Sequence, residues 1–205
     1  MTTHDRMADH WWWRPGWGPG SRFLTFHLTF QLSPGLHRLA AEYRAALADL
    51  GGLDPVPDAS LHMTLQGLNF ADRVSGDDLR AVLSAAQSRL ARFPAFDLRV
   101  HRPEITPEAI RWEATPSGPP AAVRAALRDA IGTVWDTVPE PAEFAPHITI
   151  AYSNATGPAA PVRAALDAVT TDPATVHVDQ VELIVLNRDR RMYEWDTHTQ
   201  LTLAK

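Results

Sequence analysis

The sequence predicts an α+β fold in which two similar halves face each other across a central cleft. The order helix, strand, helix, strand, strand occurs twice along the 205 residues, in repeat units of about 33–115 and 117–203. A His-x-Thr motif lies in an apolar strand at the same place in each unit, at His62 and at His147. Duplicated units usually pack about a pseudo-two-fold axis. We therefore expect the two motif-bearing strands to face each other across the cleft.

An arm and an additional strand precede the repeat. Residues 1–21 form a tryptophan-rich arm, and residues 22–205 form a single two-lobed domain. The run "RFLTFHLTFQ" at 22–31 alternates in the way that is typical of a strand with one buried face and one mixed face. Its mixed face carries a third copy of the motif, at His27 and Thr29, which has no counterpart in the repeat.

The elements of the first unit follow from helix and turn signals. Ser33 and Pro34 begin a helix whose leucines recur at helical spacing until Leu50, where two glycines end it. The strand "SLHMTLQGL" follows, and a capping box of Ser75 and Asp78 begins the second helix. Two strands, "AFDLRVH" and "EAIRWEAT", complete the unit.

The second unit repeats this order. Ser117 begins a helix that extends through Val134, and the strand "HITIAY" follows it. A helix near 161–169 comes next, and the strands "TVHVDQVELIVL" and "MYEWDTHTQLTL" end the chain.

Composition excludes several classes of protein. A hydrophobic fraction of 45% suits a folded domain with a real core, and a net charge of −5 argues against a protein that coats long nucleic acid. The absence of cysteine excludes disulfides, thiolate catalysis and zinc–thiolate sites. No apolar stretch approaches the length of a membrane span, so we expect a cytoplasmic protein without membrane contact.

The two repeated motifs place a matched set of groups on the cleft. Residues two apart in a strand share a face, so His62 lies beside Thr64, and His147 beside Thr149. Two imidazoles can supply the base and the acid of a phosphodiester reaction, because the pKa of histidine is close to neutrality. The threonine hydroxyls can donate hydrogen bonds to phosphate oxygens.

The pair "LHMTL" and "PHITI", 85 residues apart, resembles the two-histidine phosphoesterase superfamily, which includes the 2′-5′ RNA ligase-like proteins and cyclic nucleotide phosphodiesterases. The resemblance implies a bilobal fold of two antiparallel β-sheets with helices on the outside. It also implies that His62 and His147 are the catalytic pair and that Thr64 and Thr149 bind phosphate. The RNA ligase branch commonly carries an arginine shortly after the second motif, where this chain has Tyr152.

Other residues are possible substrate contacts. If the strand at 22–31 is central in its sheet, His27 and Thr29 face the same cleft, and Tyr152 can reach a phosphate or stack on a base. Arg188, in "LNRDRRMY" with Arg190 and Arg191, either extends a phosphate-binding path or belongs to a solvated hairpin tip. The arm's tryptophans either stack on a nucleobase or, as we favour, pack on the first helices. These tryptophans are Trp11, Trp12, Trp13 and Trp17.

Three functions remain open on the sequence alone. The leading one is a metal-independent phosphoesterase that hydrolyses a 2′,3′-cyclic phosphate or a related small ribonucleotide diester. The alternatives are a 2′-5′ RNA end-joining ligase and a binding module for nucleotide or RNA without turnover. We expect no metal, no cofactor and no obligate protein partner, and a substrate that is a small ribonucleotide or an RNA end.

Overall fold

Antiparallel pairing joins strands that are far apart in the sequence in the computed structural model, which describes residues 4–204. One four-stranded sheet has the order β12–β11–β2–β4, and its strands are β2 (Phe23–Thr29), β4 (His62–Phe70), β11 (Gln180–Asn187) and β12 (Glu194–Thr202). The other has the order β3–β8–β7–β6, and its strands are β3 (Leu53–Pro55), β6 (Glu104–Ile105), β7 (Ala109–Glu113) and β8 (His147–Ser153). Two two-stranded ladders pair β5 (Phe96–Val100) with β10 (Ala174–Val178), and β1 (Arg6–Met7) with β9 (Gly157–Pro158). The α+β class with antiparallel sheets is thus confirmed.

Each motif-bearing strand lies in a sheet with strands from the other half of the chain. The strand that begins at His62, β4, shares its sheet with β11 and β12, whereas β8, which begins at His147, shares its sheet with β6 and β7. The strands β5 and β10, which hold matching positions in the two halves, pair with each other.

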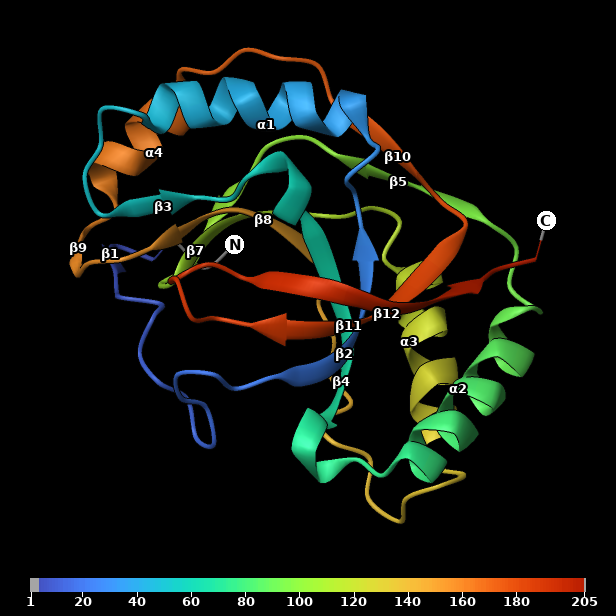
Figure 1. Cartoon of the computed structure of the whole chain (residues 1–205). Coiled ribbons are helices and arrows are strands. Elements are labelled where there is room, and N and C mark those ends of the chain that lie inside the picture. Colours follow the sequence, from blue (N-terminus) through green and yellow to red (C-terminus); the bar gives the residue numbers. More distant parts are fainter. Residues whose placement is uncertain (1–3, 205) are drawn as a thin grey trace.

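The helices form two pairs that lie on either side of the strands (Figure 1). They are α1 (Pro34–Leu47), α2 (Gly76–Leu90), α3 (Gly118–Ile131) and α4 (Ala160–Asp167), with 3₁₀ turns η1 (Asp58–Ser60) and η2 (Ala71–Arg73). Helix α1 contacts α4 and β10, whereas α2 contacts α3 and β12.

The helix ends show why one boundary was predicted well and another was not. The Ser75 hydroxyl accepts a hydrogen bond from the amide of Asp78 at 3.0 Å, which confirms the expected N-cap of α2. Helix α1, expected to reach Leu50, ends at Leu47. Beyond it the amide of Leu50 bonds to the carbonyl of Leu47, so the last turn tightens to i, i+3 bonding before the glycines.

The single strand expected at 175–186 is two strands in different sheets. The chain turns between β10 and β11 at Asp179. Apolar residues fall at even positions up to Val178 and resume at odd positions with Val181 and Leu183. This change of phase marks the break, because a continuous strand keeps its alternation.

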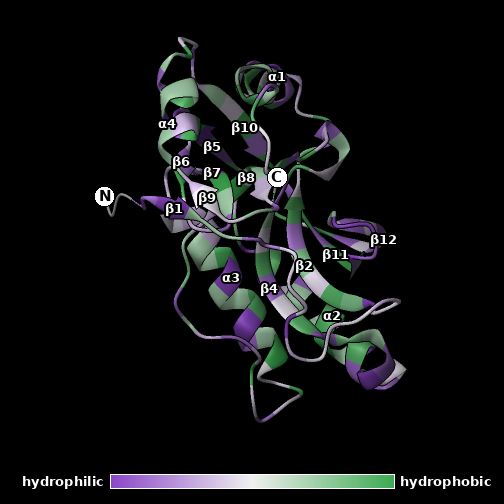
Figure 2. Ribbon diagram, turned by 90° about the vertical axis from the view of Figure 1, so that its left-hand side faces the viewer, coloured by the Kyte–Doolittle hydropathy of each residue, from purple (hydrophilic) through white to green (hydrophobic). Residues whose placement is uncertain are grey.

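The core lies between the sheets and the helices. Hydrophobic and hydrophilic residues follow one another along β2 and β4, which lie next to each other in the sheet (Figure 2). Phe26, Leu28 and Met63 are fully buried on the hydrophobic side of these strands. In the described part of the chain, no helix combines the length and apolar character needed to cross a membrane.

Candidate active site

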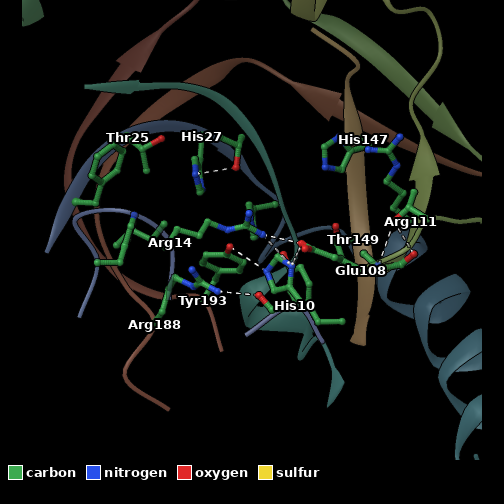
Figure 3. Close-up of a pocket in the computed structure, with 18 of the residues that line it drawn as sticks. His10, Arg14, Thr25, His27, Glu108, Arg111, His147, Thr149, Arg188 and Tyr193 are labelled. Carbon is green, nitrogen blue, oxygen red and sulfur yellow. Dashed lines mark hydrogen bonds and ion pairs between the residues drawn. The ribbon is translucent and has the colours of Figure 1, made fainter. Parts of the chain in front are cut away.

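A cavity of about 390 Å³ lies where both large sheets meet the N-terminal arm. Strands β2 and β4 line it from one side and β7 and β8 from the other (Figure 3). The arm contributes His10, Arg14 and Trp17, and the segment between β11 and β12 contributes Arg188 and Tyr193. The cavity is therefore built from segments that are distant in the sequence.

His62 and His147 enter the cavity with the same ring geometry. Nδ1 of His62 lies 2.8 Å from the carbonyl oxygen of Ser60, and Nδ1 of His147 lies 2.8 Å from that of Ala145. A carbonyl oxygen can only accept, so Nδ1 carries the proton in both rings and Nε2 holds the lone pair when the ring is neutral. Nε2 of neither ring has a hydrogen-bond partner among residues 4–204. Each histidine is thus held by the backbone two residues before it.

A β-bulge follows each histidine at the same distance. Leu65 has no partner in the ladder of β4 with β2, and Ile150 has none in the ladder of β8 with β7. A bulge shifts the alternation of side chains by one residue. Tyr152 therefore faces the cavity together with Thr149, although strict alternation would turn it into the core.

The surroundings of both rings favour their neutral forms. Burial lowers the pKa of His62 from 6.5 to about 4, the hydrogen bond to Ser60 opposes this, and positive charge on His147 lowers it further. Burial also lowers the pKa of His147, and the charge of Arg111 acts in the same direction. Since charge on His147 disfavours charge on His62, the pair accepts one proton more readily than two.

His27 lies behind this pair as a neutral, fully buried ring. It stacks on His62 with ring centroids 4.6 Å apart and an interplanar angle of 3°, and burial holds its pKa well below the usual value. Its Nε2 lies 3.1 Å from the Thr64 hydroxyl (Figure 3), and its buried Nδ1 has no partner among residues 4–204. A buried N–H without a partner is rarer than a buried acceptor without one. We therefore assign the proton to Nε2, which donates to Thr64 and leaves the Thr64 hydroxyl proton free.

The arm closes one end of the cavity through a polar cluster around His10. Burial lowers the pKa of His10 to about 4, so the ring is neutral at pH 7. Its Nδ1–H donates to the Glu108 carboxylate at 3.0 Å, which leaves Nε2 to accept from the Tyr193 hydroxyl at 3.0 Å. Its ring stacks on Tyr152 at 4.3 Å, and Arg14 donates to the same carboxylate at 2.7 Å. This cluster fixes the arm against both sheets.

Comparison with protein-family models decides the family. Residues 32–190, which include both motifs and both bulges, match the model of the 2′-5′ RNA ligase superfamily. The chain belongs to this superfamily.

Solved structures agree with this assignment. TT0787 of Thermus thermophilus superposes with a TM-score of 0.66 at 21% identity, over 88% of this chain and 97% of that one. E. coli LigT complexed with 3′-AMP gives 0.66 at 19% identity, over 90% and 99%, and its apo form gives 0.64 at 20% identity over the same shares. The fold of this superfamily member is therefore LigT-like. No curated protein matches the sequence.

The cavity of this superfamily member collects most of the residues that the sequence singled out. Thr29 ends β2, where it pairs with His62, and lies outside the cavity lining. The predicted residues that do line the cavity are His27, His62, Thr64, His147, Thr149, Tyr152 and Arg188.

The two open interpretations of the arm and the arginine turn now have structural answers. The arm packs on strands and not on the first helices: the Trp11 indole donates to Asp54 of β3 at 2.8 Å, and Trp17 packs on Phe23 and Phe70. That expected contact was wrong. Arg188 is buried at the cavity, whereas Arg190 is exposed and ion-paired with Glu194.

Sequence reasoning missed several groups in the cavity. Arg111 carried a signal, because it alternates with the apolar Ile110 and Trp112 and so shares a face with its cross-strand partner Thr149. His10 and Arg14 carried none, since the arm has no periodicity. Among the residues that the structure describes, no three His, Asp or Glu side chains come together in a way that could hold a metal ion.

Proposed function

We propose that the protein is a metal-independent phosphoesterase that hydrolyses a 2′,3′-cyclic phosphate or a related small ribonucleotide diester. One observation carries the proposal: two imidazoles with the same fixed tautomer offer Nε2 to one cavity. A base and an acid on either side of a phosphate are what such a reaction needs.

We assign His62 as the base, because burial lowers its pKa to about 4 and so keeps its Nε2 unprotonated. Nε2 of His62 removes a proton from the attacking water, whose oxygen forms the new P–O bond. Nε2–H of His147 protonates the ribose oxygen as its P–O bond breaks. The product is a phosphomonoester, and both histidines end with their proton states exchanged. The negative charge of the substrate favours the protonated form of His147 on binding.

The hydroxyls of Thr64 and Thr149 stabilise charge on the nonbridging oxygens. Thr64 receives a hydrogen bond from His27, so its own proton is available to the phosphate. Thr149 lies beside His147 on the opposite wall, with Arg111 as its cross-strand partner. These bonds strengthen as charge develops on phosphorus oxygens in the transition state.

We also infer that the two halves of the domain, about 33–115 and 117–203, are related by a pseudo-two-fold axis, with residues 1–21 as an added arm. Three features that recur in both halves support this. Nδ1 of each histidine bonds to the carbonyl of the second residue before it, and a bulge follows each histidine after three residues. In addition, each half contributes strands to the sheet that holds the other half's histidine. An axis of this kind would present the base and the acid from opposite sides of one phosphate.

Nucleotides are the substrate class that the relatives support. E. coli LigT, which shares the fold, has been crystallised with 3′-AMP and with ATP. The mixed polar and aromatic lining of this cavity suits a ribonucleotide of similar size.

The test compares leaving groups in the purified protein and its variants. We expect His62→Ala and His147→Ala each to lower hydrolysis of a cyclic phosphate by about 10²- to 10⁴-fold. A 2′-deoxyribonucleoside 3′-(4-nitrophenyl) phosphate has no 2′-hydroxyl to attack its own phosphorus, so water must attack, and its leaving group needs no proton. With this substrate His147→Ala should regain most of the lost rate, whereas His62→Ala should not. A folded His62→Ala variant with wild-type turnover, or recovery by the wrong variant, would refute the assignment of roles.

A further inference from the structure

One of the arginines that line the cavity forms no ion pair with a carboxylate in the described part of the chain. Arg14, Arg111 and Arg188 all line it. Arg14 binds the Glu108 carboxylate at 2.7 Å, and Arg111 binds the Glu104 carboxylate at 2.7 Å. Arg188 has no carboxylate partner within residues 4–204, although only 4% of its surface is exposed.

The hydrogen bonds of Arg188 are also incomplete. Nη2 donates to the carbonyl of His10 at 3.1 Å, whereas Nε and Nη1 are buried and have no partner in the described part of the chain. Burying a guanidinium without a counter-ion raises the free energy of the folded protein, and cation–π contacts with aromatic rings offset only part of that increase. The guanidinium carbon lies 5.4 Å from the Trp11 ring, 5.7 Å from the Trp17 ring and 5.4 Å from the Tyr193 ring. The site is therefore built around a positive charge that lacks an anion.

Arg188 lies near the catalytic histidines but does not contact them. Tyr193 separates the two: its ring is 5.9 Å from the His62 ring and 5.4 Å from the Arg188 guanidinium carbon. Figure 3 shows Arg188 beside Tyr193 and His10, away from His147. The distance from the centre of the His62 ring to the guanidinium carbon of Arg188 cannot exceed the sum of these two distances. One nucleotide can span a distance of that size.

We propose that Arg188 forms a second phosphate subsite, so that the preferred substrate is a ribonucleotide with a terminal phosphate in addition to the diester at the histidines. A guanidinium offers two parallel N–H donors, and a phosphate accepts them in bidentate fashion. The proposal rests on the proposed function for the position of the diester, and the unpaired charge defines the second group. A 5′-phosphorylated 2′,3′-cyclic nucleotide is the smallest substrate with both groups.

Access to the guanidinium requires the Trp17 ring to move. Trp17 is half-buried and lies in the glycine- and proline-rich segment of the arm, where Gly16 and Gly20 have φ of +82° and +81°. Trp11 is tied by its indole to Asp54, and Tyr193 by its hydroxyl to His10. Trp17 is thus the ring of the three that can be displaced with least loss of hydrogen bonding.

The decisive measurement is a ratio of specificity constants. We expect wild-type protein to hydrolyse 5′-phosphorylated adenosine 2′,3′-cyclic phosphate with a kcat/KM about 10- to 100-fold above that of the unphosphorylated form. Arg188→Met should bring this ratio close to one, and Arg188→Lys should keep part of it. Arg190→Met, at the exposed arginine two residues away, is the matched control and should keep the wild-type ratio. A purely structural role for Arg188 would lower both constants together and leave the ratio unchanged, which would overturn the proposal.

A binding experiment separates this proposal from the proposed function. Calorimetry should show adenosine 5′-monophosphate binding about 10-fold or more tightly than adenosine, with the difference lost in Arg188→Met and kept in Arg190→Met. Wild-type protein that hydrolyses both cyclic substrates equally would refute the subsite and leave the phosphoesterase intact. Protein that hydrolyses neither, but still shows the Arg188-dependent difference in binding, would refute the phosphoesterase and support the subsite.

Discussion

Replacing His27 by phenylalanine tests whether this residue acts on the reaction only through Thr64. The phenyl ring keeps the stack on His62 but removes the Nε2–H that donates to the Thr64 hydroxyl at 3.1 Å. A hydrogen bond to a charged group contributes about 1.5–3 kcal/mol. Loss of the oriented Thr64 bond to phosphate should therefore lower kcat/KM about ten- to a hundredfold. The bond to Thr64 is the one hydrogen bond that His27 makes through its side chain within residues 4–204, so the free energy of unfolding should fall by only about 1 kcal/mol.

A double-mutant cycle shows whether His27 acts through Thr64 or independently of it. We would measure kcat/KM on a cyclic phosphate over a range of pH for wild type, His27→Phe, Thr64→Val and the double variant. If His27 works through the Thr64 hydroxyl, its replacement should have no further effect once Thr64 is valine. Both limbs of the pH profile should persist, since the fully buried His27 does not titrate with the reaction. Additive losses in the double variant, or loss of one limb in His27→Phe, would refute this reasoning.

Four further outcomes are expected. The plot of kcat/KM against pH should peak between about pH 4 and 6.5, because burial lowers the pKa of both His62 and His147. Above the higher of the two pKa values kcat/KM should fall about tenfold per pH unit. An unchanged rate up to pH 8 would contradict this. Turnover should survive EDTA, and loss restored by a divalent ion would contradict it. Thr149→Ala should cost less than His147→Ala in the same assay. Unfolding free energy, measured with urea, should decline by about 1.4 kcal/mol per pH unit for each of His10 and His62 as pH falls from 6.5 to about 4. The sign follows because the unfolded chain, with its ordinary pKa, takes up these protons first. His10→Gln should reduce the slope.

Local patterns in the sequence were sufficient for most elements and for the paired motifs. The spacing of apolar residues predicted the four helices, and the Ser75 cap set the start of α2. The alternation around His62 and His147 predicted which side chains share a face with them. These features depend on residues a few positions apart, which is why the sequence alone reveals them.

Features that depend on pairing between distant strands were not predictable in the same way. The bulge at Ile150 exists only relative to β7, and it alone turns Tyr152 toward the cavity. The split of 175–186 into β10 and β11 depends on partners in two different sheets, although the change of phase at Asp179 was visible in the sequence. The arm is the extreme case, because His10 and Arg14 gain their positions only from contacts with Glu108 and Tyr193, far along the chain.

The net charge of −5 argued against a protein that coats long nucleic acid, but it does not describe the charge inside the cavity. Within the cavity the relevant quantity is the pairing of each charge, since paired groups in a partly dry site largely cancel. The carboxylates of Glu108 and Glu104 neutralise the charges of Arg14 and Arg111, respectively. Arg188 has no such partner within residues 4–204. An acidic protein can therefore present a local positive site, and one unpaired guanidinium fixes both the sign and the place of the group it would bind. A long nucleic acid would need many such charges along a track. A single unpaired guanidinium beside two histidines does not form such a track.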